Sequence, residues 1–296
     1  MTTRIIAGLL LCVLLAGGAP RLATAQSSVV DSQYRTTLLQ LIAALQQQIV
    51  ALQAELAKRQ TTERAALRPT DATPPNFPYT ILSEYDVTPQ TTELRTADSS
   101  RKTFFNRVLE LTPVQYRASL VGFVVFDGGR RTSDAYVTGK KYSTGYFEWY
   151  FGVSDEFLGE QLSRTIIDEL IVHELGHIVS LEEALDPGEV YECHQTISAG
   201  GDCPNPRSIY SQFVAEFWPE ELLDELDGGG TDFRGVEVRG YETHFVSDYA
   251  SANPAEDFAE TFMMYVLDSA PDYNTSITRE KIAWLSQSAD LQKIRR

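Results

Sequence analysis

An apolar segment with two histidines four residues apart constrains this chain most. Residues 166–183 read IIDELIVHELGHIVSLEE, and their aliphatic side chains recur at the spacing of an α-helix. Residues four apart lie on one helix face, so His173 and His177 can reach a single metal ion. Glu174 directly follows His173 and is placed to reach a water molecule bound to that ion rather than the ion itself. The alternative is a buried helix with locally paired histidines, which is disfavoured because the chain has only four His.

A second helix is expected to supply the third ligand. Asn253 is a good N-cap, Pro254 suits the first helical position, and an apolar stripe follows. Glu256 and Glu260 lie on one face of this helix. Two carboxylates flanked by alanine and buried aromatic side chains are costly to bury without a cation. We therefore expect Glu256 to bind the metal ion.

Alternatives to this assignment remain open. Glu256 holds the third helical position, where it can instead complete a capping box, and Glu260 can instead be solvated. Glu183 lies six residues after His177, where metzincin peptidases place their third ligand. Those enzymes break the helix with a glycine, and Ser180 stands at that point here. Glu256 is therefore preferred over Glu183.

The two segments resemble the catalytic domain of the anthrax lethal factor family of gluzincin zinc metallopeptidases. In that family a tyrosine precedes, by seven residues, a glutamate that opens an E-x-x-A-E helix. Tyr249 and Glu256 have this separation, and Ala259 and Glu260 complete the pattern. The resemblance covers about 166–181 and 247–266. Without the matched spacing, Tyr249 would be interpreted as an aromatic side chain packing at the helix entry.

The resemblance implies a Zn²⁺ ion held by His173, His177 and Glu256, with Glu174 as the catalytic base. It also implies that Tyr249 donates to the oxyanion and that Glu260 orients a ligand histidine. The expected function is zinc-dependent hydrolysis of peptide bonds in a protein or peptide substrate. The large accessory domains of that toxin are not seen, so its own substrate and delivery route do not carry over.

The N-terminus predicts export. Arg4, an apolar core over residues 5–16 and the A-x-A site at residues 23–25 form a secretion signal over residues 1–25. We therefore expect a secreted or cell-envelope protein. In an oxidising compartment Cys193 and Cys203 are expected to form a disulfide. The alternative is a zinc site shared with His194.

After the signal, residues 26–60 predict a helical coiled-coil segment. Residues 32–59 carry a heptad seam that suits a parallel two-stranded coil, and hence a possible homo-oligomer. The a positions are Ile42, Ile49 and Leu56, and the d positions are Leu38, Leu45 and Leu52. Packing on the catalytic domain and a pro-segment are the alternatives. A linker rich in Pro and Thr over residues 61–78 then leads to a zincin-like peptidase domain over residues 79–296.

The expected fold class is α+β, a zincin-like domain with a small mixed sheet and the motif helix. Strands are predicted over 119–126, 136–138 and 145–153, and helices over 101–109 and 208–226, the latter broken by Pro219. Zinc peptidases commonly bind an extended substrate along an edge strand just ahead of the motif helix, and the aromatic strand 145–153 is a candidate for that role. The alternative, a strand whose aromatic face packs in the core, stays open.

The net charge of −16 argues against nucleic acid as a partner. The glycine run between Asp227 and Asp232 could bind calcium, although a mobile loop is preferred. Two other functions remain: a non-catalytic cell-surface interaction protein with a zinc-binding zincin domain, and a zinc hydrolase of non-peptide amides. The presence of Glu174 favours the endopeptidase, because a chain without catalysis could lose it.

Overall fold

The computed structural model divides the chain into two units, Met1–Glu55 and Leu56–Arg296. The predicted signal, most of the linker and the part of the glycine run beyond residue 229 lie outside the described residues. Within the described part of the chain, no helix has both the length and the apolar character needed to cross a membrane. The structure describes residues 34–48, 51, 52, 55, 59, 75, 77–87, 94, 97–113, 115–129, 133–141, 147–185, 193–197, 203–229, 241, 243–292 and 294.

The first unit contains a helix over residues 34–48, within the predicted coiled-coil segment. Its side chains are exposed throughout, including Leu38, Ile42 and Leu45 of the predicted seam. The helix is therefore formed as expected, whereas association through it remains a prediction.

The second unit contains a four-stranded mixed sheet in the order β1-β2-β4-β3. The pair β2 and β4 is parallel, and the two outer pairs are antiparallel. The strands are β1 (Ile81–Asp86), β2 (Leu120–Phe126), β3 (Ala135–Lys141) and β4 (Phe147–Ser154). The central strands β2 and β4 are buried along their whole length, as their apolar and aromatic sequences require.

The aromatic strand lies inside the sheet rather than at its edge, in agreement with the alternative of an aromatic face in the core. It forms β4, which lies between β2 and β3, and its side chains Trp149 and Phe151 pack in the core. The chain returns from β3 antiparallel onto β4, so that β3 covers the side of β4 that would otherwise be free. β3 is therefore the edge strand on this side of the sheet, and β1 is the edge strand on the other.

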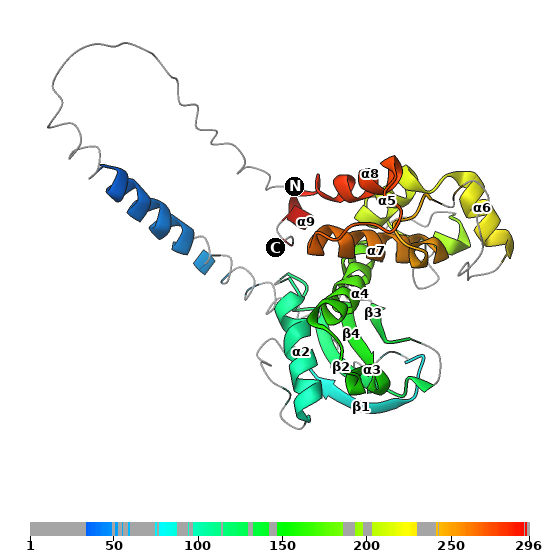
Figure 1. Ribbon diagram of the computed structural model, residues 1–296, viewed down its shortest axis with the longest axis horizontal. Coiled ribbons are helices and arrows are strands. Elements are labelled where there is room, and N and C mark those ends of the chain that lie inside the picture. The colour runs from blue at the N-terminus through cyan, green and yellow to red at the C-terminus, as the bar shows by residue number, and fades with distance from the viewer. Residues whose placement is uncertain are drawn as a thin grey trace, which may run out of the picture. The chain divides into compact units, whose positions relative to one another are not determined.

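Helices α2 (Ser99–Leu111), α3 (Asp155–Gly159) and α4 (Arg164–Ala184) pack beside the sheet (Figure 1). Phe104 of α2 contacts Phe123 and Phe151 of the sheet, with ring centroids 6.2 and 6.1 Å away. The bidentate ion pair between Arg107 and Asp168 then joins α2 to α4. Helix α2 thus contacts both the sheet and the motif helix.

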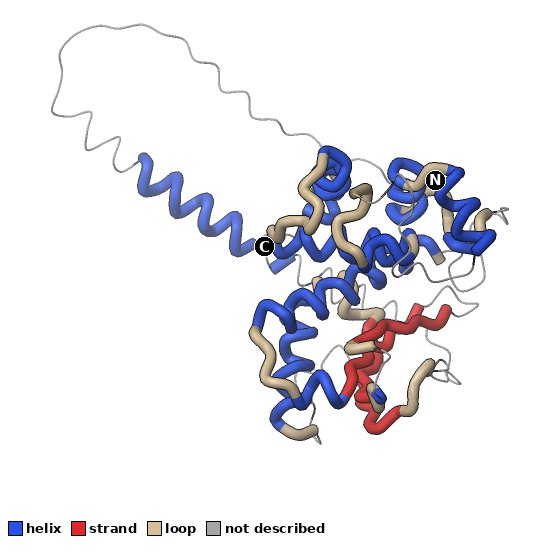
Figure 2. Tube along the Cα trace, turned by 45° about the vertical axis from the view of Figure 1, so that its right-hand side comes forward, coloured by secondary structure: helices blue, strands red, loops and turns tan. Residues whose placement is uncertain are grey.

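The other helices lie on the far side of α4 from the sheet, as Figures 1 and 2 show. They are α5 (Ile209–Phe217), α6 (Glu220–Gly229), α7 (Pro254–Leu267), α8 (Ser276–Leu285) and α9 (Ala289–Gln292). Pro219 separates α5 from α6, and α7 begins at Pro254, as predicted. The described unit is therefore an α+β fold with a small mixed sheet, and α4 lies between its two parts.

Candidate metal centre

The site forms where α4 and α7 approach each other closely. A Cβ atom added to Gly176 would lie only 2.8 Å from Cα of Ala259, so a larger residue would push the helices apart. Small residues at both positions therefore bring the first turns of α7 against the face of α4 that carries the histidines.

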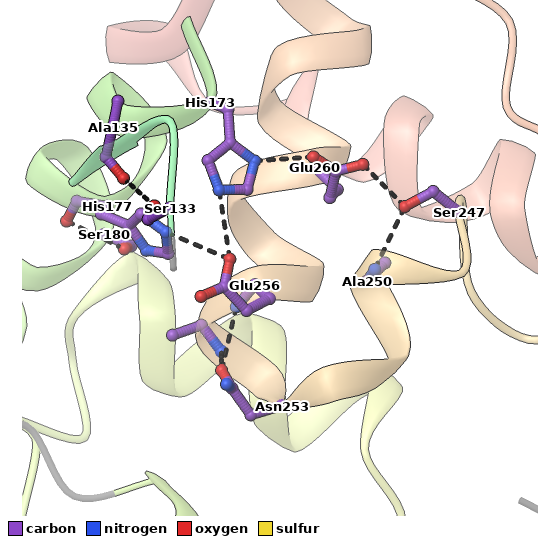
Figure 3. Close-up of polar contacts among 11 residues, drawn as sticks. Ser133, Ala135, His173, His177, Ser180, Ser247, Ala250, Asn253, Glu256 and Glu260 are labelled. Atoms are coloured by element: carbon purple, nitrogen blue, oxygen red, sulfur yellow. Dashed lines mark hydrogen bonds and ion pairs between the residues drawn. The ribbon is translucent and has the colours of Figure 1, made fainter. Parts of the chain in front are cut away.

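The histidines and one carboxylate of α7 converge at this crossing (Figure 3). Oε2 of Glu256 lies 3.1 Å from Nε2 of His173 and 3.3 Å from Nε2 of His177. The ligand atoms of the three residues lie within 4.8 Å of one another. This buried Oε2 atom lies at ion-pair distance from both imidazoles but forms no well-aligned hydrogen bond with either, an arrangement that a cation bound among the three groups would suit. Two imidazoles and a carboxylate are ligands that suit zinc.

The helix cap sets where α7 begins. The Asn253 side chain accepts hydrogen bonds from the backbone N–H groups of Ala255 and Glu256, at 2.9 and 3.0 Å. Asn253 therefore caps α7 as predicted, while the Glu256 carboxylate faces the histidines.

The electrostatics favour positive charge between these side chains. Burial opposes protonation of His173, but the carboxylates of Glu256 and Glu260 outweigh it and raise its pKa to about 10. Burial alone would raise the pKa of Glu256, yet the imidazoles of His177 and His173 hold it well below its usual range. A cation placed among these groups would meet the same favourable potential.

Glu260 orients His173 from the side away from Glu256. Its Oε1 lies 2.6 Å from Nδ1 of His173, and its Oε2 accepts a 2.6 Å hydrogen bond from the Ser247 hydroxyl. This contact directs Nε2 of His173 toward the ligand cluster, as carboxylates behind metal-binding histidines do. Sequence reasoning missed Ser247, because a hydroxyl thirteen residues before Glu260 has no diagnostic spacing.

Glu174 lies with the histidines in a cleft of about 400 Å³, which is also lined by Val137 of the edge strand β3. Burial is the main cause that raises the pKa of Glu174, and a hydrogen bond with the Val137 backbone acts in the opposite direction. A raised pKa makes the carboxylate a stronger base near neutral pH.

Tyr249 lies at the mouth of the same cleft. It begins the 3₁₀ turn η3 (Tyr249–Ala252), just before α7. Its ring centroid is 5.6 Å from that of His173, and the residue is 44% exposed. Tyr249 thus both lines the cleft and contacts the His173 ring.

Glu183 is not brought to the histidines. It is exposed near the end of α4 and lines a different cavity, together with Arg207 and Tyr116. The helix continues without a break through Ser180 to Ala184, so the chain does not turn back toward the histidines as the alternative assignment would require.

The structure joins Cys193 and Cys203 by a disulfide bond. Their sulfur atoms are thus not free to bind zinc with His194. The imidazole of His194 instead contacts Glu220 and Asp227, each at 2.9 Å. This histidine and its partners belong to the loop and α6, outside the cleft.

No protein-family model, curated protein or solved structure matches this chain. The likeness to gluzincin peptidases therefore remains a prediction, and the roles of these side chains rest on their geometry.

Proposed function

We propose that this protein is a zinc-dependent endopeptidase with a zincin-like fold. The observation that carries the proposal is the convergence of His173, His177 and Glu256 in a cleft that also contains the buried Glu174. His173 and His177 would hold the ion through Nε2, and Glu256 through its carboxylate. When bound, zinc lowers the pKa of a water molecule toward about 7 and polarises a carbonyl group.

Glu174 is the base of the proposed reaction. Its carboxylate accepts a proton from the attacking water, whose oxygen bonds to the carbonyl carbon of the substrate. The same proton is then delivered to the amide nitrogen as the C–N bond breaks, which releases an amine and a carboxylic acid. The burial that raises the pKa of Glu174 supports both transfers.

Tyr249 and Glu260 assist in different ways. The phenol of Tyr249 donates a hydrogen bond to the substrate oxygen as negative charge develops on it. Glu260 stays bonded to Nδ1 of His173 and keeps Nε2 of that ring directed at the ligand cluster.

The substrate class follows from the edge strand. Among the described strands, β3 pairs with β4 alone, and Ala135, Tyr136 and Val137 of β3 line the cleft. An extended peptide can therefore add along the side of β3 that no described strand occupies, through backbone hydrogen bonds. The role of an edge strand thus falls to β3 rather than to the aromatic strand β4, and it supports a protein or peptide substrate.

We place this activity outside the cytoplasm, as a secreted or cell-envelope protein. The disulfide between Cys193 and Cys203 and the predicted signal over residues 1–25 support this location.

Digestion of a peptide library by the zinc-loaded protein tests the proposal. We expect internal peptide bonds to be cleaved, cleavage to stop with a chelator, and activity to return on addition of zinc. A protein that binds zinc fully but cleaves no peptide would contradict the endopeptidase and favour the interaction protein or the hydrolase of non-peptide amides.

A further inference from the structure

A fully buried ion pair lies directly beside the proposed ligand Glu256. The carboxylate of Asp257 accepts a 2.6 Å hydrogen bond from Nζ of Lys281 in α8 and a 2.9 Å hydrogen bond from Nε1 of Trp218. Both side chains of the ion pair have no exposed surface, and Trp218 is 3% exposed. Three parts of the chain that are distant in sequence therefore meet at one carboxylate.

The surroundings of this pair are aromatic. Nζ of Lys281 lies 4.8 Å from the ring centroid of Phe245 and about 6 Å from those of Phe213 and Phe217. Taking two charges out of water into such a site is costly, and apolar residues of similar volume often stabilise a fold as well or better. The pair is thus a poor means of raising stability, while the hydrogen bonds from Lys281 and Trp218 to Oδ2 hold the Asp257 side chain in place.

Asp257 lies in the first turn of α7, where Asn253 caps the N–H groups of Ala255 and Glu256. The first turn of a helix lacks most of its internal hydrogen bonds and frays easily. The N–H of Asp257 makes the bond to the Asn253 carbonyl, at 3.0 Å, and Glu256 precedes it in the same turn. Successive helical side chains point about 100° apart, so fixing the direction of Asp257 also fixes that of Glu256.

We propose that Asp257, Lys281 and Trp218 are positioning residues for the metal centre. They hold the first turn of α7 in the rotation that presents the Glu256 carboxylate to His173 and His177. This inference rests on the proposed function, because it assumes that those three residues bind zinc.

The test replaces the ion pair by apolar residues of similar size, Asp257→Leu together with Lys281→Met. Zinc affinity is measured by competition with a chromophoric chelator, and the Tm is measured in excess chelator. We expect the Kd for zinc to rise about tenfold or more, with the Tm of the zinc-free protein unchanged or raised. A role in stability alone would lower that Tm and leave the affinity of the folded protein unchanged.

Two further variants keep the test decisive. Arg107→Met with Asp168→Leu removes the ion pair between α2 and α4, and zinc affinity should stay at the wild-type value. Trp218→Phe keeps both charges and removes one hydrogen bond to Asp257, so it should weaken zinc binding about fivefold even if the double variant at Asp257 and Lys281 does not fold.

Unchanged zinc affinity in the Trp218→Phe protein, or in a folded Asp257→Leu, Lys281→Met protein, would overturn the inference while leaving the proposed metal centre intact. An equal loss in the Arg107→Met, Asp168→Leu control would also overturn it, because the effect would then be general. Failure of the wild-type protein to bind zinc is a different result, which refutes the metal centre and the inference together.

Discussion

Neighbouring residues of one helix have separate roles in the proposed reaction. His173 points Nε2 at Glu256, whereas Glu174 is buried beside the edge strand. The difference follows from the helical repeat, which rotates consecutive side chains by about 100°. Substitutions at the two positions should therefore separate metal binding from catalysis.

Glu174→Gln should keep the fold and the zinc content and lose nearly all peptidase activity. The amide has almost the same shape as the carboxylate, but it cannot accept the proton of water. The measurement is kcat together with the zinc content of the purified protein. Glu169→Gln, on the same helix, is the matched control and should remain active. Full activity of the Glu174→Gln protein would exclude this residue as the base.

Tyr249→Phe should lower kcat by about ten- to a thousandfold, the range expected for losing one donor to an oxyanion. Zinc content and KM should change little, because the phenol donates mainly in the transition state. Tyr116→Phe, which removes a hydroxyl from another cavity, serves as the control. An unchanged kcat would mean that Tyr249 only packs at the helix entry.

At the scale of elements, the crossing of α4 and α7 determines the site. Gly176→Ala places a methyl group against the backbone of Ala259 and should separate the helices. We expect a loss of about 1–3 kcal/mol in the free energy of unfolding and weaker zinc binding, because Glu256 and Glu260 move with α7. Position 159 has open space around it, so Gly159→Ala should change neither the free energy of unfolding nor the zinc affinity. Wild-type stability and zinc affinity in the Gly176→Ala protein would contradict this account.

Local periodicity was enough to predict several elements and part of the site. The spacing of apolar residues predicted β2, α4 and α7, and the cap at Asn253 followed from residue type. The place of β4 within the sheet did not follow, because aromatic residues suit an edge strand and a central strand equally well. Long-range pairing with β2 and β3 decided it.

Contacts between distant parts of the chain explain what sequence reasoning missed in the site. Ser247 reaches Glu260 across a turn, and Lys281 reaches Asp257 from a separate helix. In neither pair does the separation of the two residues in the sequence match the repeat of a helix or a strand. The histidine pair, in contrast, lies within one helix turn, where spacing alone brings the side chains together.

At the scale of the whole molecule, the helix over residues 34–48 exposes an apolar stripe, with Leu38 52% and Leu45 51% exposed. Such a stripe is costly in water unless another surface covers it. We expect the mature protein to sediment as a dimer and Leu38→Glu with Leu45→Glu to sediment as a monomer. Gln40→Glu with Gln47→Glu adds the same charge off the seam and should leave a dimer. A monomeric wild-type protein would refute the coil.

The zinc content of three proteins tests the central claim most directly. Wild-type protein and the Glu183→Ala variant, purified without added chelator, should each contain about one zinc ion per chain by elemental analysis. Glu256→Ala should lose most of it, because one of three protein ligands is gone. Zinc retained in the Glu256→Ala protein but lost from the Glu183→Ala protein would contradict the account and assign the third ligand to the end of α4.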